Sequence, residues 1–187
     1  MITVIIILIL NYLMSTIIKK SEKKLLCTVY TDASWKEISP KRGKKTVLSS
    51  WAMYARCKDE KIEMAQSFTN NSSESPTHAE ARAIYNAIKK CYNKWPDLDI
   101  IFVNTDSLAV CHSMWPDGIG RQNMRVTNNQ PETLGIINVM KEWIEKRNLI
   151  HRFKHVKAHT GGNDIRSKVN DLVDRKAKEI RLKSERQ

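Results

Sequence analysis

Cysteine, glycine and proline are scarce in this sequence of 187 residues, which contains 4 cysteines, 6 glycines and 5 prolines. So little glycine and proline, with no internal repeat and no low-complexity stretch, excludes a collagen-like or disordered chain. The cysteines are spread along the chain at Cys27, Cys57, Cys91 and Cys111. They form no CxxC pair and lack the spacing of a zinc site, which argues against a disulfide scaffold and favours a reducing, cytoplasmic compartment.

Acidic residues are fewer than basic ones. The sequence has 20 Asp and Glu against 32 Lys and Arg, a formal net charge of +12. On a chain of one-domain length, such a charge favours a polyanionic partner, most often nucleic acid and sometimes an anionic membrane surface. The apolar share of 41% and the charged share of 28% are typical of a soluble globular protein. Composition does not separate an enzyme from a binding protein.

An apolar run occupies residues 2–18 and is followed by Lys19 and Lys20. Its length is at the short limit for a membrane span, which usually needs about 20 residues. No basic segment precedes the run and no small-residue cleavage site follows it, so a secretory signal peptide is not expected. Three interpretations stay open: a short signal anchor, an extra element packed on the domain, or a translated leader upstream of a start at Met14.

We therefore divide the chain into an apolar N-terminal extension, residues 1–24, and a domain, residues 25–187. Membrane contact is expected only through residues 2–18. If this run inserts, the lysines after it favour a cytosolic domain. All three interpretations leave the domain in a reducing compartment.

Apolar periodicity predicts the order βββαβααβα for the rest of the chain. Strands are expected at residues 25–33, 47–57, 62–68, 99–105 and 150–158, and helices at residues 76–92, 107–115, 131–147 and from about 169. A basic turn is expected at residues 36–45, and Ser75 is predicted to cap the first helix. This order predicts an α/β fold, a mixed five-stranded sheet with helices on both faces.

Two carboxylates occupy positions that the apolar pattern turns inward. Asp32 ends the first predicted strand, although an aspartate there could also open a turn. Glu80 shares one helical stripe with apolar residues, namely Ile84, Ala87 and Cys91. Its alternative role is in a capping box with Thr77, in which the glutamate returns to the helix N-terminus.

Two further acids lie at the ends of later elements. Asp106 follows a buried strand, where ligands bind in α/β sheets, although it could also cap the next helix. In the last helix Asp174 flanks the apolar face and shares its side with Asn170, whereas Asp171 points away from that face. We therefore predict a functional role for Asp174 and a solvated position for Asp171.

Four acids gathered on one small sheet would repel one another unless a cation neutralised them. Oxygen ligands favour Mg²⁺ or Mn²⁺ over zinc, and a pair of such ions is the recurring device for phosphodiester hydrolysis. A helix through His151, His155 and His159 would suggest a zinc site, but the β character of this segment argues against one. His159 lies in a loop and is either a proton shuttle beside the metals or a plain surface histidine.

Five segments of the chain together resemble ribonuclease H of the bacterial and retroviral type over about residues 25–178. They are Tyr-Thr-Asp-Ala-Ser (30–34), His-Ala-Glu-Ala-Arg-Ala-Ile (78–84), Asn-Thr-Asp-Ser (104–107), His-Val-Lys-Ala-His-Thr-Gly (155–161) and Asn-Asp-Leu-Val-Asp-Arg-Lys-Ala (170–177). Each segment alone is a weak signal, but the five in this order on these elements make a specific match.

The resemblance implies an endonuclease that hydrolyses the RNA strand of an RNA–DNA hybrid. It implies two Mg²⁺ ions, with Mn²⁺ as a substitute, bound by Asp32, Glu80, Asp106 and Asp174. His159 would assist catalysis, and the substrate would contact Asn170, Ser34 and Ser107. No small-molecule cofactor is expected, and we expect a monomer.

Some positions depart from the family pattern. Ala33 replaces a usual glycine, and Leu108 replaces a polar residue that contacts the minor groove. Residues 115–130 lie where some members carry a basic protrusion, and with Arg121 and Arg125 they are predicted to form a substrate loop. Two alternatives stay open: a nuclease of the same fold that acts on DNA, as resolvases and transposases do, and a non-catalytic hybrid-binding module.

Overall fold

The computed structural model describes residues 24–38, 46–68, 75–115, 122–157 and 164–186. The strands are β1 (Leu26–Ile38), β2 (Thr46–Cys57), β3 (Glu60–Ser67), β4 (Ile100–Thr105) and β5 (Ile150–His155). The helices are α2 (Pro76–Lys94), α3 (Leu108–Met114), α4 (Pro131–Glu145) and α5 (Ile165–Glu185), with a short 3₁₀ turn at Gln122–Met124. The predicted order βββαβααβα is confirmed.

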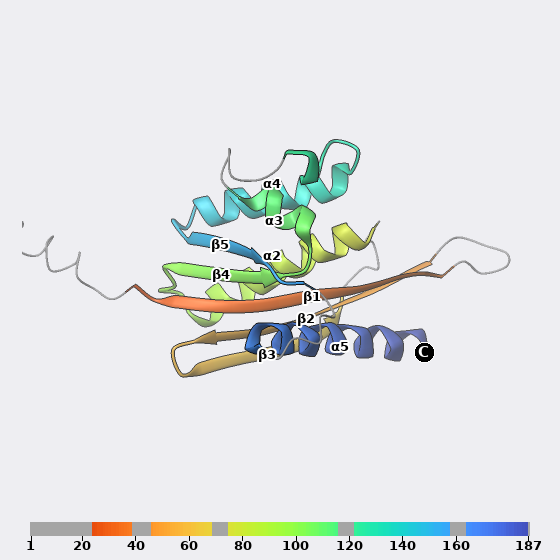
Figure 1. Ribbon diagram of the computed structural model, residues 1–187, viewed down its shortest axis with the longest axis horizontal. Helices are drawn as coiled ribbons and strands as arrows, with labels where there is room; N and C mark the ends of the chain where they lie inside the picture. Colours follow the sequence, from red (N-terminus) through yellow and green to blue (C-terminus); the bar gives the residue numbers. More distant parts are fainter. Residues whose placement is uncertain (1–23, 39–45, 69–74, 116–121, 158–163, 187) are drawn as a thin grey trace, which may run out of the picture.

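The strands form one mixed sheet in the order β3-β2-β1-β4-β5 (Figure 1). β1, β2 and β3 form an antiparallel meander, whereas β4 lies parallel to both β1 and β5. Parallel pairing brings the carboxyl ends of β4 and β5 to one edge of the sheet, where ligands bind in α/β folds.

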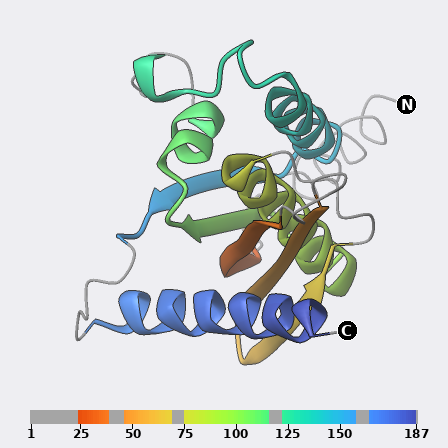
Figure 2. The same ribbon diagram turned by 90° about the vertical axis from the view of Figure 1, so that its right-hand side faces the viewer.

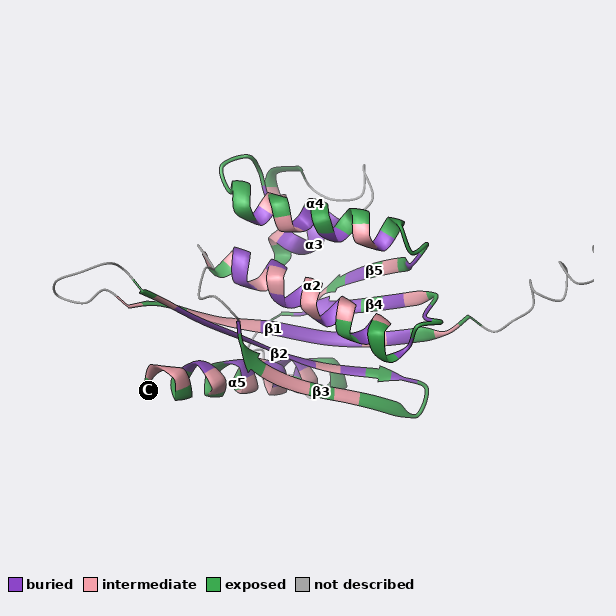
Figure 3. Ribbon diagram, turned by 180° about the vertical axis from the view of Figure 1, so that it is seen from behind, coloured by how far each residue is buried: buried purple, intermediate pink, exposed green. Residues whose placement is uncertain are grey.

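Helices cover both faces of the sheet, as predicted (Figure 2). α2, α3 and α4 lie on one face, and the main core forms there from residues such as Val29, Ile84 and Val103, all with no exposed surface. α5 packs on the other face against β1, β2 and β3, over a smaller cluster that includes Tyr30 and Val173. Buried residues follow the middle of β1 and one side of α2 (Figure 3).

The first strand is longer than predicted. We expected it to end at Ala33 and a basic turn to begin at Lys36, but β1 pairs with β2 without interruption as far as Ile38, opposite Thr46. Hydrogen bonds to a neighbouring strand hold Lys36 and Glu37 extended although their side chains are exposed. Asp32 consequently lies in the middle of a strand and not at its end.

The last helix begins four residues earlier than predicted, at Ile165 instead of Val169. Asp164 is its N-cap, and its carboxylate accepts hydrogen bonds from the backbone N–H groups of Arg166 at 2.9 Å and Ser167 at 3.2 Å. This local cap stabilises a first turn that lacks an apolar pattern. The strand β5 is shorter than predicted, because its pairing with β4 ends at His155.

The apolar run at residues 2–18 lies outside the described residues, so the interpretations of this run and the division at residue 24 stay predictions. Among the residues that are described, no helix combines the length and apolar character needed to cross a membrane.

Candidate active site

Asp32, Glu80 and Asp106 come together from three different elements. Each offers a carboxylate oxygen, and these oxygens lie within 4.8 Å of one another. The strands β1 and β4 are parallel neighbours, and Tyr30 of β1 pairs with Asn104 of β4. Asp32 and Asp106 each follow two residues later in the same direction, so they lie side by side. Glu80 reaches the same place from α2, which packs on β1. The predicted convergence of these acids is therefore observed for three of the four.

Asp32 is almost fully buried, with 3% of its surface exposed. It pairs with Ala52 across the β1–β2 ladder, so the alternative in which it opens a turn is excluded. Its Oδ1 accepts a hydrogen bond from the backbone N–H of Ala33 at 2.7 Å.

Glu80 does not cap its helix. Ser75 is the N-cap of α2, and its hydroxyl accepts a hydrogen bond from the backbone N–H of His78 at 3.1 Å. Glu80 therefore lies beyond the third helical residue, where a capping-box glutamate would be, and the alternative with Thr77 is wrong. Its Oε1 instead accepts from the Ala33 N–H at 3.1 Å, so one backbone amide contacts both Asp32 and Glu80.

Asp106 lies between β4 and α3, directly before Ser107, which is the N-cap residue of α3 and makes no side-chain capping hydrogen bond. The negative charge of Asp106 also affects a thiol in the neighbouring core. Burial, together with this charge, raises the pKa of the Cys111 thiol to about 12. The carboxylate of Asp106 thus lies at the boundary between the apolar core and the acidic cluster.

The cluster is electrostatically strained in the absence of a cation. Burial raises the pKa of Asp32 to about 7, with a further contribution from the negative charge of Asp106. Burial, followed by the charges of Asp32 and Asp106, raises the pKa of Glu80 well above its usual value. Three carboxylates held this close favour either shared protons or a bound cation.

The donor set fits a divalent metal ion. Glu80 Oε2 is buried and has no hydrogen-bond partner among the described residues, which leaves one carboxylate oxygen available inside the cluster. All candidate ligand atoms are carboxylate oxygens, the donors that Mg²⁺, Mn²⁺ and Ca²⁺ prefer.

The fourth predicted acid, Asp174, lies near this cluster but is not among the three that form it within the described residues. Its negative charge contributes to the raised pKa of Asp32. Asn170, one turn earlier on α5, is only 2% exposed, and its Oδ1 has no hydrogen-bond partner in the described part of the chain. Asp171 is partly exposed and belongs to no acidic cluster among the described residues.

The other predicted site residues have different surroundings. The Oγ of Ser34 accepts a hydrogen bond from Arg181 Nε on α5 at 2.8 Å. The backbone N–H of Ser107 donates to the hydroxyl of Thr105 at 3.1 Å. His159 lies outside the described residues. The contacts of Ser34, Ser107 and Asn170 with a substrate stay predictions.

Two features of the site were not predicted. The Ala33 amide that contacts two carboxylates is a backbone group, and no side-chain pattern could reveal it. The buried Arg181 links Ser34 to Glu185 on its own helix, at 3.1 Å, and Glu185 also pairs with Lys36 of β1. An arginine spaced four residues before a glutamate predicts an ion pair within the helix, but it does not predict the strand that the pair holds.

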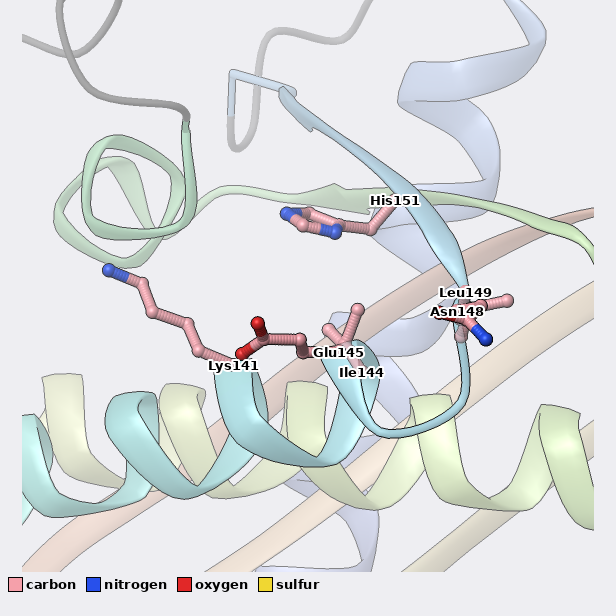
Figure 4. A pocket seen from close by; sticks show the side chains of 6 residues that line it. All are labelled: Lys141, Ile144, Glu145, Asn148, Leu149 and His151. Carbon is pink, nitrogen blue, oxygen red and sulfur yellow. The ribbon is translucent and has the colours of Figure 1, made fainter.

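A pocket of about 420 Å³ lies between α4 and the start of β5, at the opposite end of β5 from the acids (Figure 4). It is lined by Lys141, Ile144, Glu145, Asn148, Leu149 and His151. The ring of His151 contacts the backbone carbonyl of Met114 at 3.3 Å, and burial lowers its pKa. Because His151 joins no group of metal-ligating side chains among the described residues, the acidic cluster remains the candidate active site.

The family model for RNase H matches residues 24–181, a span that contains the acidic cluster. The chain belongs to the RNase H family. It is accordingly a ribonuclease H, a hydrolase of the RNA strand of RNA–DNA hybrids. The resemblance noted in the sequence is confirmed.

Solved RNase H structures share the fold. RNase H1 from the archaeon Halobacterium salinarum NRC-1 has 16% identity and a TM-score of 0.57, covering 85% of this chain and 98% of that one. The N-terminal RNase H domain of Rv2228c from Mycobacterium tuberculosis has 12% identity and a TM-score of 0.58, with 87% and 98% covered. The RNase H domain of prototype foamy virus has 20% identity and a TM-score of 0.55, with 86% and 96% covered. Comparison with curated proteins gives no significant match.

Proposed function

We propose that this RNase H is a Mg²⁺-dependent endonuclease that uses two divalent ions, held by Asp32, Glu80, Asp106 and Asp174. The observation that carries the proposal is the cluster of three carboxylates with oxygens within 4.8 Å of one another. One of their oxygen atoms, Glu80 Oε2, is buried and has no hydrogen-bond partner among the described residues. Mn²⁺, which accepts the same oxygen donors, is expected to substitute for Mg²⁺. A location in the cytoplasm and a monomeric state remain predictions.

Divalent ions held by Asp32, Glu80, Asp106 and Asp174 would supply positive charge near the scissile phosphate and would lower the pKa of a bound water. The chain itself supplies the arrangement. The parallel strands β1 and β4 place Asp32 and Asp106 beside each other, because Asp106 directly follows β4. The backbone N–H of Ala33 orients the carboxylates of Asp32 and Glu80 by hydrogen bonds. Preorganisation of this kind avoids the cost of gathering like charges when the substrate binds. By analogy with the family, the products carry a 5′-phosphate and a 3′-hydroxyl.

The proposed substrate is an RNA–DNA hybrid. A solved foamy viral protease–reverse transcriptase, which has 16% identity to this chain and a TM-score of 0.51, was captured with an RNA/DNA hybrid. For this protein the net charge of +12 supports binding to the phosphate backbone. Recognition through A-form shape and 2′-hydroxyl groups would involve Asn170, Ser34 and Ser107, and His159 would carry protons.

Cleavage of an end-labelled hybrid in Mg²⁺, beside single-stranded RNA, duplex RNA and duplex DNA, tests the proposal. We expect cleavage of the RNA strand in the hybrid alone, and loss of cleavage in EDTA. Comparable cleavage of duplex DNA would favour the alternative of a DNA nuclease. Hybrid binding without cleavage in both Mg²⁺ and Mn²⁺ would contradict the catalytic proposal.

The chain offers a matched pair for the fourth ligand, because Asp174 and Asp171 lie on the same helix. We expect Asp174→Asn to lower the rate of hybrid cleavage at least about 100-fold, since it removes a ligand for the catalytic ions. Asp171→Asn removes the same charge one turn away and should change the rate less than about threefold. Equal effects of the two substitutions would remove Asp174 from the proposed metal site.

A further inference from the structure

An apolar patch is exposed on the face of the sheet that carries α5. We define it as Leu26, Ile100, Phe102 and Ile150. Leu26 is 41% exposed, Phe102 38% and Ile150 36%, and Ile100 is half-buried. Leu26, Ile100 and Ile150 form one row across β1, β4 and β5, and Phe102 belongs to the same face two residues along β4.

α5 leaves this part of the sheet uncovered. The helix packs on β1, β2 and β3, and in Figure 1 it does not extend to the end of the sheet where β1 and β4 begin. Single exposed apolar residues are common, but neighbouring ones on adjacent strands form a continuous apolar surface. Such a surface is typical of a contact site for another apolar segment.

The described chain begins beside this patch. The backbone N–H of Leu25 donates to Asp99 Oδ2 at 2.7 Å, and its carbonyl accepts from the N–H of Ile100 at 3.0 Å. The N–H of Ile150 donates to the carbonyl of Asp99 at 2.8 Å. Hydrogen bonds through Asp99 therefore connect Leu25, near the first described residue, to Ile100 and Ile150 of the patch.

An uncharged apolar segment therefore precedes the patch along the chain. Residues 2–18 contain no charged side chain, and only residues 19–23 separate them from the described chain. A connection of that length spans up to about 17 Å, enough to reach any residue of the patch. Because the segment and the patch share one chain, their effective concentration is far above that of a separate partner.

We propose that residues 2–18 pack on the apolar patch of their own chain. The inference is independent of the catalytic proposal, because no residue of the patch belongs to the acidic cluster. In this contact the apolar segment 2–18 and the apolar patch cover each other. Two exposed arginines lie near the patch: Arg56 pairs with Thr28, and Arg152 pairs with Phe102. Their positive charges do not repel an uncharged segment.

Photo-crosslinking of the full chain tests the contact directly. A benzophenone side chain replaces Phe102, and in a matched control it replaces Val139, which is 48% exposed on α4 across the sheet. We expect peptide mapping to find intramolecular cross-links from position 102 to residues 2–18, and none from position 139. Cross-links between two chains would assign the patch to self-association instead, and absence of any link to residues 2–18 would overturn the proposal.

A variant of the patch provides a second measurement. Phe102→Asp places a charge in the proposed contact and should raise the rate of proteolysis within residues 2–18 about tenfold or more, because the released segment is open to the protease. Hybrid cleavage by the variant reports that the domain is folded. The wild-type chain should not float with neutral or anionic vesicles, whereas the variant should. Flotation of the wild type would favour a membrane anchor and contradict the proposal.

Discussion

At the scale of single residues, the acidic cluster is a local cost to the stability of the fold. Asp32 and Glu80 are held by one backbone amide in a place where burial opposes their charge. Carboxylates in an unselected core position would be replaced by apolar side chains, which need no partner. Under the proposed function, their presence is a trade-off between stability and activity.

The raised pKa of Asp32 has a consequence for stability. Between the ordinary value of 3.8 and about 7, the folded protein holds a proton on Asp32 that the unfolded chain has released. Without divalent ions, stability should therefore fall as pH rises through this window. Asp32→Asn removes this loss and should stabilise the protein in EDTA at pH 8 by up to about 4 kcal/mol, while abolishing hybrid cleavage.

Thermal unfolding of wild type and variant at pH 5 and pH 8 in EDTA measures this effect. Asp97→Asn, at an exposed position in a turn, is the control and should leave the pH dependence unchanged. Addition of Mg²⁺ at pH 8 should stabilise the wild type more than Asp32→Asn. The opposite outcome is that wild type and Asp32→Asn gain the same stability between pH 5 and pH 8 in EDTA. That result would contradict a raised pKa of Asp32.

At the scale of elements, the start of α2 determines where Glu80 lies. Ser75 accepts the N–H of His78 and so sets the first turn of the helix that carries Glu80. Ser75→Ala should destabilise the protein by about 1 kcal/mol, because it leaves a helix N–H without its cap. Ser75→Asp keeps a capping oxygen and should retain most of the stability. Urea unfolding compares the three proteins, and equal loss in both variants would argue against the cap.

α4 contains a glycine with no structural requirement. Gly135 is exposed in the interior of this helix, and a Cβ added there would meet no atom within 4 Å. Gly135→Ala should raise stability by about 0.5 to 1 kcal/mol, since alanine loses less backbone entropy on folding. Calorimetry should show an increase of about 1–4 °C in Tm, with unchanged hybrid cleavage. A decrease would show that Gly135 has a packing role.

At the scale of the whole molecule, the surplus of positive charge should govern binding. With the inactive Asp32→Asn variant, the logarithm of hybrid affinity should fall linearly with the logarithm of KCl concentration, with a slope of magnitude about 3 or more. Affinity that is insensitive to salt would contradict a role for the net charge of +12.

Substitution of one lysine tests which part of the surface contributes to the salt dependence of hybrid binding. Lys157 lies just after β5 at the edge of the sheet that holds Asp106, and it lines a pocket of about 360 Å³ with Arg166 at the start of α5. Lys157→Ala should reduce the salt slope by about 1 and weaken hybrid binding. Lys141→Ala, in the pocket at the opposite end of β5, is the matched control and should change neither quantity.

The sequence by itself predicted the order of the elements and the three acids that the structure brings together. Apolar periodicity is local, so Glu80 on the apolar stripe of α2 and Asp106 after a buried strand could both be recognised before any tertiary contact was known. The motifs around these acids were also sufficient to indicate the family, which the match over residues 24–181 confirms.

Only the tertiary structure decided what depends on neighbours distant in the sequence. The extension of β1 to Ile38 results from pairing with β2, and Asp32 is buried because β2 lies beside it. The Ala33 amide meets Glu80 only when α2 packs on β1. The exposure of Phe102 depends on where α5 ends its cover of the sheet. Each is a property of two elements brought together, and no single stretch of sequence contains it.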